Sequence, residues 1–165
     1  MPSRRDCFFN ATPEEAEEQI DALNKQLSLD FKRTSGVYDI FDAIDETNNS
    51  VMECKRRTCC ATSYDDTLIG LNKYDCWKKK YSTYNFYATF MFQDGLYYFK
   101  FDNHKTLEEQ GLFTTTNHKD TIYNNQTNYE KKHINIPTDR LIPLGNSTKI
   151  IPSLKKGVCY LRDTR

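Results

Sequence analysis

Cysteine and histidine are the residues of this sequence that could bind a metal ion, form a covalent link or act on a substrate. The three histidines, His104, His118 and His133, have no hydrolase or metalloprotease motif around them. The six glycines include no phosphate-binding loop. The sequence therefore predicts a protein that is not an enzyme and that carries no cofactor.

The cysteines are concentrated in one segment, CKRRTCC at residues 54–60, which Cys76 follows. This spacing lacks the two close cysteine pairs typical of a structural zinc site, and no histidine lies near it. An even number of cysteines spread over the chain is instead typical of a secreted disulfide framework. Adjacent Cys59 and Cys60 are not expected to bridge each other, and the pairing is otherwise open. We expect disulfides to involve Cys7, Cys54, Cys59, Cys60, Cys76 and Cys159.

Four Asn-x-Ser/Thr sequons also favour secretion, because such sites accept N-glycans in secreted proteins. They begin at Asn10, Asn48, Asn125 and Asn146. The opening MPSRRDCFFNAT has no apolar segment of the kind found in signal peptides, so a secreted form is expected to be a mature one. The sequence predicts an extracellular glycoprotein.

Charge and hydropathy argue against nucleic acid and membrane as partners. Lys+Arg and Asp+Glu are balanced at 23 each, and no apolar run approaches the roughly 20 residues of a membrane span. Basic clusters at residues 55–57, 78–80 and 131–132 are interpreted as solvated loops, with contact to another protein as the alternative.

One helix is indicated at residues 12–27 of what we expect to be a single domain, residues 1–165. Thr12 is an N-cap, Pro13 suits the first helical position, and Glu15 completes a capping box. An apolar stripe follows at helical spacing, comprising Ala16, Ile20, Leu23 and Leu27. This helix is expected to lie against the rest of the domain.

From residue 35 the pattern changes to the period of a strand, first in GVYDIFDAID and then in residues 51–63. The middle segment DDTLIGLNKYDCWKKK is ambiguous between a loop with a short turn and another strand. Later strands are expected in GLFTTT, in DTIYNNQTNYEKKHINI and in residues 149–162. Pro137, Pro143 and Pro152 indicate edges, bends or loops.

Nine of the eighteen residues in YNFYATFMFQDGLYYFKF, residues 84–101, are aromatic. Asp94-Gly95 predicts a two-residue hairpin loop with Phe92 opposite Tyr97 and Phe90 opposite Phe99. One face of this hairpin is then aromatic, comprising Tyr84, Phe86, Ala88, Phe90, Phe92, Tyr97, Phe99 and Phe101. A helix followed by antiparallel strands predicts a mainly β fold, either a barrel of residues 35–162 or a β-sandwich.

The pattern over most of the chain resembles the tick salivary lipocalins, including the histamine-binding type. The resemblance rests on the capped helix, the strand GVYDIFDAIDETNNS leading to VMEC, the aromatic hairpin and the late segment KKGVCYLRD. The lipocalin Gly-x-Trp signature is present only as Gly36-Val37-Tyr38. Members usually continue into another cysteine-bearing segment, whereas this chain ends six residues after Cys159.

The resemblance implies an antiparallel lipocalin-like β-barrel and a secreted, non-enzymatic protein in host blood. Its partner would be a small amine such as histamine or a hydrophobic ligand such as a lipid or sterol, and some members act on a host immune protein or cell. The residues that fall where a cavity wall would be are Asp39, Phe41, Trp77, Phe86, Phe90, Phe99 and Phe101. The alternative is a filled core at these positions, with Asp39 on a solvated strand face, in a secreted protein that binds other proteins.

Overall fold

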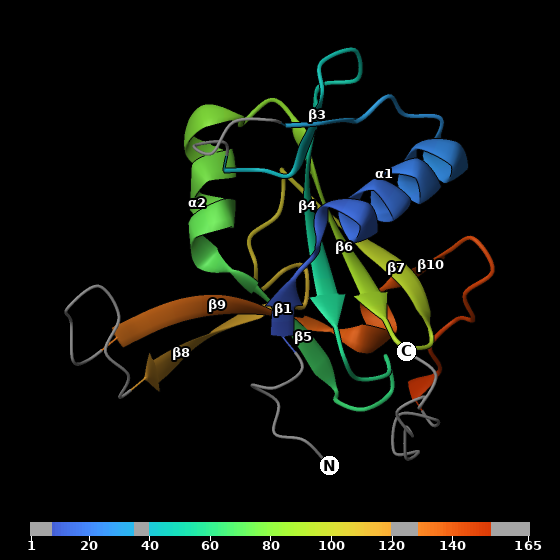
Figure 1. Ribbon diagram of the computed structural model, residues 1–165. Helices are drawn as coiled ribbons and strands as arrows, with labels where there is room; N and C mark the ends of the chain where they lie inside the picture. The colour runs from blue at the N-terminus through green and yellow to red at the C-terminus, as the bar shows by residue number, and fades with distance from the viewer. Residues whose placement is uncertain (1–7, 35–39, 120–128, 153–165) are drawn as a thin grey trace.

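The computed structural model describes residues 8–34, 40–119 and 129–152 (Figure 1). These residues contain two α-helices, α1 (Pro13–Leu27) and α2 (Leu71–Lys80), and a short 3-10 turn at Thr138–Arg140. The strands are β1 (Phe8–Asn10), β2 (Lys32–Arg33), β3 (Ala43–Asp45), β4 (Ser50–Arg57), β5 (Asp66–Gly70), β6 (Asn85–Phe92), β7 (Gly95–Phe101), β8 (Phe113–Lys119), β9 (Tyr129–Pro137) and β10 (Ile142–Leu144). The expectation of a mainly β fold is confirmed.

The described strands form two separate sheets. The large sheet has the order β10-β7-β6-β4-β3-β2, and β1 pairs with the far end of β4 beyond β3. The small sheet has the order β5-β9-β8. Pro143 lies in the edge strand β10 and Pro137 ends β9, which agrees with the positions expected for proline in sheets.

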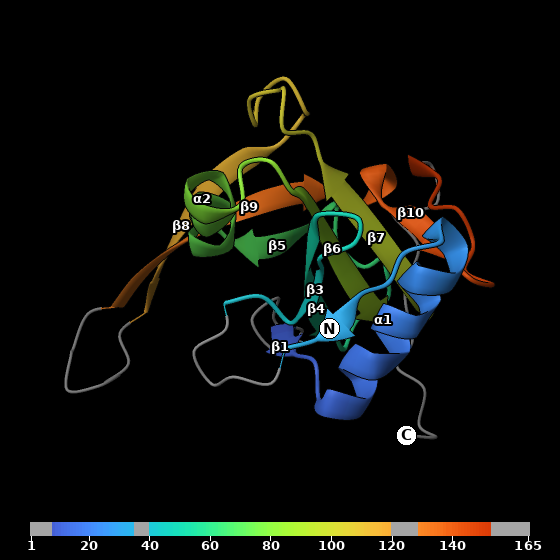
Figure 2. The same ribbon diagram turned by 90° about the horizontal axis from the view of Figure 1, so that it is seen from above.

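The two faces of the large sheet are covered differently (Figures 1 and 2). Helix α1 packs on the outer face, where its apolar side and side chains from the sheet form the outer cluster: Ala16, Ile20, Leu23, Phe31, Ala43, Met52, Cys54, Tyr87, Tyr98 and Leu144. The inner face meets the small sheet and α2 through a larger inner cluster, whose members include Phe41, Val51, Ile69, Trp77, Phe86, Phe90, Phe99, Phe101, Ile134 and Ile136. The result is a sandwich of two sheets with one helix on its outside.

Helix α1 begins and ends as its sequence predicts. Thr12 Oγ1 accepts from the Glu15 N–H at 3.2 Å, and Glu15 Oε1 accepts from the Thr12 N–H at 2.9 Å. Ala16, Ile20 and Leu23 are buried against the sheet. Buried Gln19 adds a polar contact, because its Oε1 accepts a hydrogen bond from Thr89 Oγ1 at 2.7 Å.

Replacing Thr12 with alanine is expected to lower the free energy of unfolding by about 1 kcal/mol, since the Glu15 N–H loses its acceptor. Thr12→Ser keeps the acceptor oxygen and is the matched control. Urea denaturation of the two variants and the wild type measures the difference. Equal stability of Thr12→Ala and Thr12→Ser would show that the capping box contributes nothing.

The aromatic hairpin forms with the predicted faces but a different register. Phe90 lies opposite Tyr97 and Phe86 opposite Phe101, so the two-residue loop is Gln93-Asp94. The predicted loop, Asp94-Gly95, is therefore wrong by one position, which shifts the pairing by two residues. Because strand side chains alternate with period two, this shift leaves every aromatic residue on its predicted face.

Tertiary contacts explain the position of the turn. The Gln93 N–H donates to the Cys59 carbonyl at 3.1 Å, and Asp94 Oδ1 accepts from the Ala61 N–H at 2.9 Å. Gly95 permits a close approach, since a Cβ there would lie 2.6 Å from Ser147 Oγ. The chain after β4 and the chain after β10 therefore hold the hairpin turn from two sides.

The expected antiparallel barrel is not the arrangement of the described strands. Strands β4 and β6 pair in parallel from Ser50–Asn85 to Arg56–Met91, and the two sheets do not close into a barrel. Parallel neighbours need a long crossover, which residues 58–84 supply through β5 and α2. The ambiguous segment thus contains both a strand and a helix. The alternative prediction of a β-sandwich describes the sheets better.

Candidate functional site

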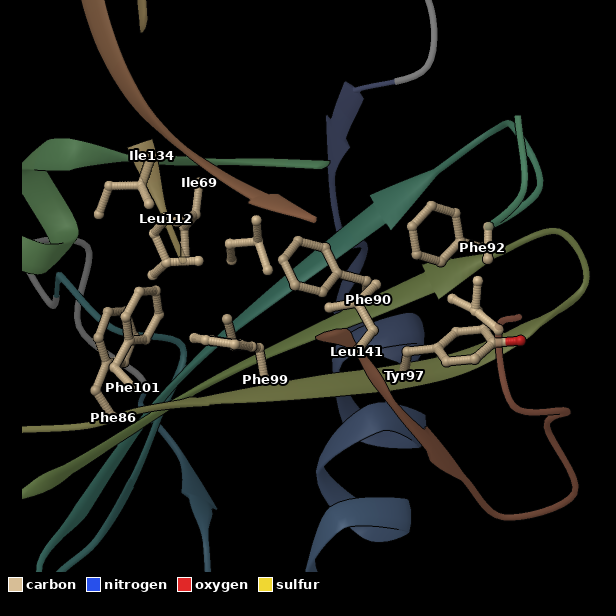
Figure 3. Close-up of a cluster of buried hydrophobic side chains, with 14 of the residues drawn as sticks. Ile69, Phe86, Phe90, Phe92, Tyr97, Phe99, Phe101, Leu112, Ile134 and Leu141 are labelled. Atoms are coloured by element: carbon tan, nitrogen blue, oxygen red, sulfur yellow. The ribbon is translucent and has the colours of Figure 1, made fainter. Parts of the chain in front are cut away.

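The aromatic face predicted for the hairpin lies in the interior of the sandwich. The aromatic face of β6 and β7 points toward the small sheet, where Ile69 and Ile134 of that sheet and Leu112, just before β8, face it (Figure 3). Among the predicted wall residues, Phe41, Trp77, Phe86, Phe90, Phe99 and Phe101 are all buried in the inner cluster. Asp39 lies outside the described residues. The structure thus brings six of the seven predicted residues together.

These rings pack directly on one another. Phe86 and Phe101 stack with centroids 4.7 Å apart, and Phe99 meets Phe101 edge to face at 5.0 Å. Trp77 lies 5.5 Å from Phe86 and donates from Nε1 to the Tyr84 carbonyl at 2.8 Å. Such ring separations are those of favourable aromatic pairs in protein cores. At this end of the inner cluster the aromatic rings therefore fill the space between the sheets.

Strand β4 places a buried acidic side chain, Glu53, in the same interior. Glu53 lies beside inner-face Ala88 in the parallel register and is only 3% exposed. Its Oε2 lies 3.0 Å from Lys73 Nζ of α2, an ion pair whose geometry is not that of a hydrogen bond. The Lys73 ammonium also donates to the Ile40 carbonyl at 2.5 Å. Glu53 Oε2 consequently has an ionic neighbour but no hydrogen-bond donor among the described residues.

The pKa of Glu53 reflects this environment. Burial, followed by a hydrogen bond to the Asp42 carboxyl group, raises the pKa of Glu53 to about 8, against the opposing effect of Lys55 and Lys73. Burial likewise lowers the pKa of Lys55, its neighbour on the inner face. Asp42 is held in place because its Oδ2 accepts from the Cys54 N–H at 2.7 Å. We call Asp42, Glu53, Lys55 and Lys73 the buried charge cluster.

Arg57 continues the charged row of the inner face and joins the two sheets. Its guanidinium lies 5.3 Å from the Phe90 ring centroid and donates from Nε to Thr67 Oγ1 at 2.9 Å and from Nη2 to the Leu68 carbonyl at 2.5 Å. The inner face therefore changes from aromatic on β6 and β7 to charged on β4. Ionisable groups that are buried and have shifted pKa values are typical of functional sites, although structural networks also contain them.

The cysteines depart in part from the predicted disulfide framework. Cys54 and Cys76 are free thiols, and Cys60 is disulfide-bonded. Cys54 points to the outer cluster, whereas Cys59 and Cys76 belong to the inner layer, so the sheet separates them. Burial raises the pKa of the Cys54 thiol, which makes it unreactive. Cys7 and Cys159 lie outside the described residues.

The sequons lie in different settings. Asn48 is exposed, but its Nδ2 donates to Asp45 Oδ2 at 2.7 Å. Burial alone would raise the pKa of Asp45, but hydrogen bonds from residues 30, 47 and 48 outweigh it and lower that pKa. Asn146 is exposed after β10. Asn10 is the last residue of β1, and Asn125 is outside the described residues. Glycosylation at these sites stays a prediction.

Sequence reasoning missed the buried charge cluster. The alternation of VMEC was sufficient to place Glu53 on the same side as Val51, but it could not show that this side is covered by a second sheet. Lys73 was in the segment whose structure was ambiguous, and its contact with Glu53 depends on α2. Within the described ranges, no group of three or more metal-ligating side chains comes together, and no helix is long and apolar enough to cross a membrane.

Comparisons with known proteins add no family to these observations. No protein-family model matches the chain, and no curated protein or solved structure is found to match it. The geometry of the inner layer is therefore the basis on which a function is proposed.

Proposed function

We propose that the chain is a secreted, non-enzymatic binding protein that takes a small amine between its two sheets, at the buried charge cluster. The observation that carries the proposal is Glu53 Oε2, a buried carboxylate oxygen with no hydrogen-bond donor among the described residues. An ammonium group is the donor that suits such an oxygen best. The resemblance to salivary lipocalins supports the same class of ligand and a role in modulating host inflammation, although the described sheets are not a closed barrel.

An amine could reach Glu53 by replacing Lys73. The Lys73 side chain is 22% exposed, so solvent reaches the cluster on this side. Aromatic rings of the inner cluster, including Phe86 on the neighbouring strand, lie close in the register and attract cations through their faces. Hydrophobic ligands, by contrast, would have to displace the stacked rings of Phe86 and Phe101.

Binding of an ammonium ion is expected to strengthen as the pH rises from about 6 to 8. The pKa of Glu53 is about 8, so the carboxyl group is largely protonated below that pH and must release its proton to pair with the ligand. The measurement is the shift in melting temperature with histamine, serotonin and a fatty acid, together with native mass spectrometry of each mixture. Ligand at 100 times its Kd stabilises a protein by about 2.7 kcal/mol.

Glu53→Gln is the test variant, because it keeps the shape of the side chain and removes the charge. The wild type is expected to melt at higher temperature with an amine, and Glu53→Gln is expected to show a much smaller shift. The fatty acid serves as the comparison ligand in both proteins. An equal shift in the two proteins would place the amine elsewhere.

A second candidate is a secreted immunomodulator that binds another protein and has a filled core. The dense packing of the aromatic rings favours it. The absence of both a melting shift and a bound mass with every ligand tested would support this candidate and exclude the small-ligand proposal.

A further inference from the structure

Lys73 reaches from α2 into the buried charge cluster and places an ammonium group there. Its Nζ lies 3.0 Å from Glu53 Oε2 and donates to the Ile40 carbonyl at 2.5 Å. We call these two oxygen atoms the ammonium site. One belongs to β4 and the other to the segment before β3, so α2 supplies the ammonium group but neither of the oxygen atoms.

The ammonium site is held in place by contacts that do not involve α2. Strand β4 pairs with β6 across Glu53, and the Glu53 carboxyl group is hydrogen-bonded to Asp42. The chain after Ile40 is also fixed, since the Thr34 hydroxyl donates to the Phe41 carbonyl at 2.7 Å. The Thr34 N–H adds a hydrogen bond to the Asp42 carbonyl at 2.9 Å. The two oxygen atoms are therefore expected to stay in position when the lysine leaves.

The position of Lys73 lets its ammonium group leave the site while the helix stays where it is. It is the third residue of α2, its side chain is 22% exposed, and its charge is carried on a flexible four-carbon stem. Rotation of this stem returns the ammonium group to water. A ligand ammonium that takes its place restores the same charge beside Glu53, so the exchange leaves the net charge of the buried charge cluster unchanged.

The two acceptors also define the kind of amine that fits. A primary ammonium has three N–H donors, so it can serve both Glu53 Oε2 and the Ile40 carbonyl. A quaternary ammonium has no N–H, and its methyl groups keep the nitrogen away from both oxygen atoms. Lys73 itself approaches through an unbranched methylene chain, so a ligand of the same shape at its amine end needs no additional space.

We propose, on the basis of the function proposed above, that Lys73 is an internal competitor for the ligand and that the ammonium site takes a primary amine on an unbranched alkyl chain. The lysine is tethered beside the site, and a ligand binds only in those molecules from which the lysine has withdrawn. The apparent affinity is then the intrinsic affinity reduced by the fraction of molecules whose site is open. Lys73 thereby sets the ligand concentration at which the protein responds.

Titration calorimetry of the full chain with n-butylamine tests the proposal, and n-butyltrimethylammonium is the matched probe without N–H donors. Lys73→Ala is expected to bind n-butylamine at least about 10-fold more tightly than the wild type, the factor for a site that is open in about one tenth of the molecules. The trimethyl compound is expected to bind at least about 10-fold more weakly than n-butylamine in both proteins, because it makes no hydrogen bond to the site.

The titrations are made at about pH 9, where an alkylamine keeps most of its proton, as free lysine does. Burial raises the pKa of Glu53 to about 8, and the charge of Lys73 opposes this shift. Lys73→Ala consequently favours the protonated carboxyl group further, and the high pH compensates by favouring the ionised form.

Two further variants locate the site. Lys79→Ala removes an exposed lysine of the same helix, so it is expected to bind n-butylamine as the wild type does. Adding Glu53→Gln to Lys73→Ala removes the carboxylate and is expected to abolish the gain in affinity. Melting temperatures establish that each variant is folded. The comparison of the two ligands on the wild type needs no substitution, so it tests the proposal even if Lys73→Ala does not fold.

The possible outcomes separate this proposal from the proposed function. Equal affinity of the wild type and Lys73→Ala for n-butylamine, or equal binding of the trimethyl compound, would overturn the internal competitor while amine binding stands. Binding by Lys73→Ala alone would support the internal competitor and show that Lys73 keeps the wild-type site closed to this amine. The absence of binding to either protein would overturn both proposals.

Discussion

Replacing Phe90 with alanine is expected to lower the free energy of unfolding by about 3–5 kcal/mol. Phe90 is fully buried in the inner cluster, near Phe92 on one side and beneath the Arg57 guanidinium on the other. Removing the ring leaves a cavity between the two sheets, beside the buried Arg57 guanidinium. Chemical denaturation followed by circular dichroism measures the change.

Phe113→Ala is the control for this experiment, because Phe113 is 51% exposed on the edge strand β8. That substitution is expected to change stability by less than about 0.5 kcal/mol. If Phe90→Ala were as mild as Phe113→Ala, the aromatic layer would be loosely packed and the wall of a cavity. In that case its loss should appear in ligand affinity instead of in stability.

Glu53→Gln is expected to remove much of the dependence of stability on pH between about 5 and 8. The pKa of Glu53 is about 8 in the folded protein, against an ordinary value of 4.5. Between these two values the folded state holds a proton that the unfolded state has released. Stability of the wild type therefore falls with rising pH, by up to about 1.4 kcal/mol per pH unit from this group.

The direction of the effect follows from the proton count. The raised pKa of Glu53 contributes stability that is complete below about pH 4.5 and is lost as the pH rises to about 8. Glutamine resembles the protonated carboxyl and can donate to Asp42, so Glu53→Gln is expected to be more stable than the wild type near pH 8. Glu18→Gln, an exposed change of the same chemistry on α1, should leave the wild-type curve unchanged. Parallel curves for Glu53→Gln and the wild type would show that the Glu53 carboxyl does not titrate in this range.

The sequence alone predicts the local features of the chain. The start of α1 depends on Thr12 and Glu15, three residues apart, and the faces of the hairpin depend on alternation within β6 and β7. Each of these is decided by neighbours within a few positions, so periodicity and capping residues predict them. The same alternation places Phe86, Phe90, Phe99 and Phe101 on one face of the hairpin.

Local sequence patterns do not predict which distant segments pair in the sheets. The hairpin register depends on Cys59, Ala61 and Ser147, which hold the turn and Gly95 from other parts of the chain. The parallel pairing of β4 with β6 depends on the crossover through β5 and α2. Sequence alternation cannot reveal it, because the period of two is the same in parallel and antiparallel strands. The barrel expectation was therefore wrong in its pairing, although strands β4, β6, β7, β8 and β9 lie within or overlap segments predicted as strands. Of GVYDIFDAID only residues 43–45 form a described strand, and most of residues 149–162 lie outside the described residues.

The sequence by itself determined a capped helix, a mainly β chain and an aromatic hairpin with one apolar face, because these depend on short-range hydrogen bonds and on the alternation of side chains. Only the tertiary structure decided what covers that face and where the charges lie. Glu53 becomes a buried carboxyl group, with a pKa of about 8, because α2 and Asp42 close over β4. Burial is a property of the surrounding segments, so the same Glu53 on an open strand would be an ordinary solvated acid.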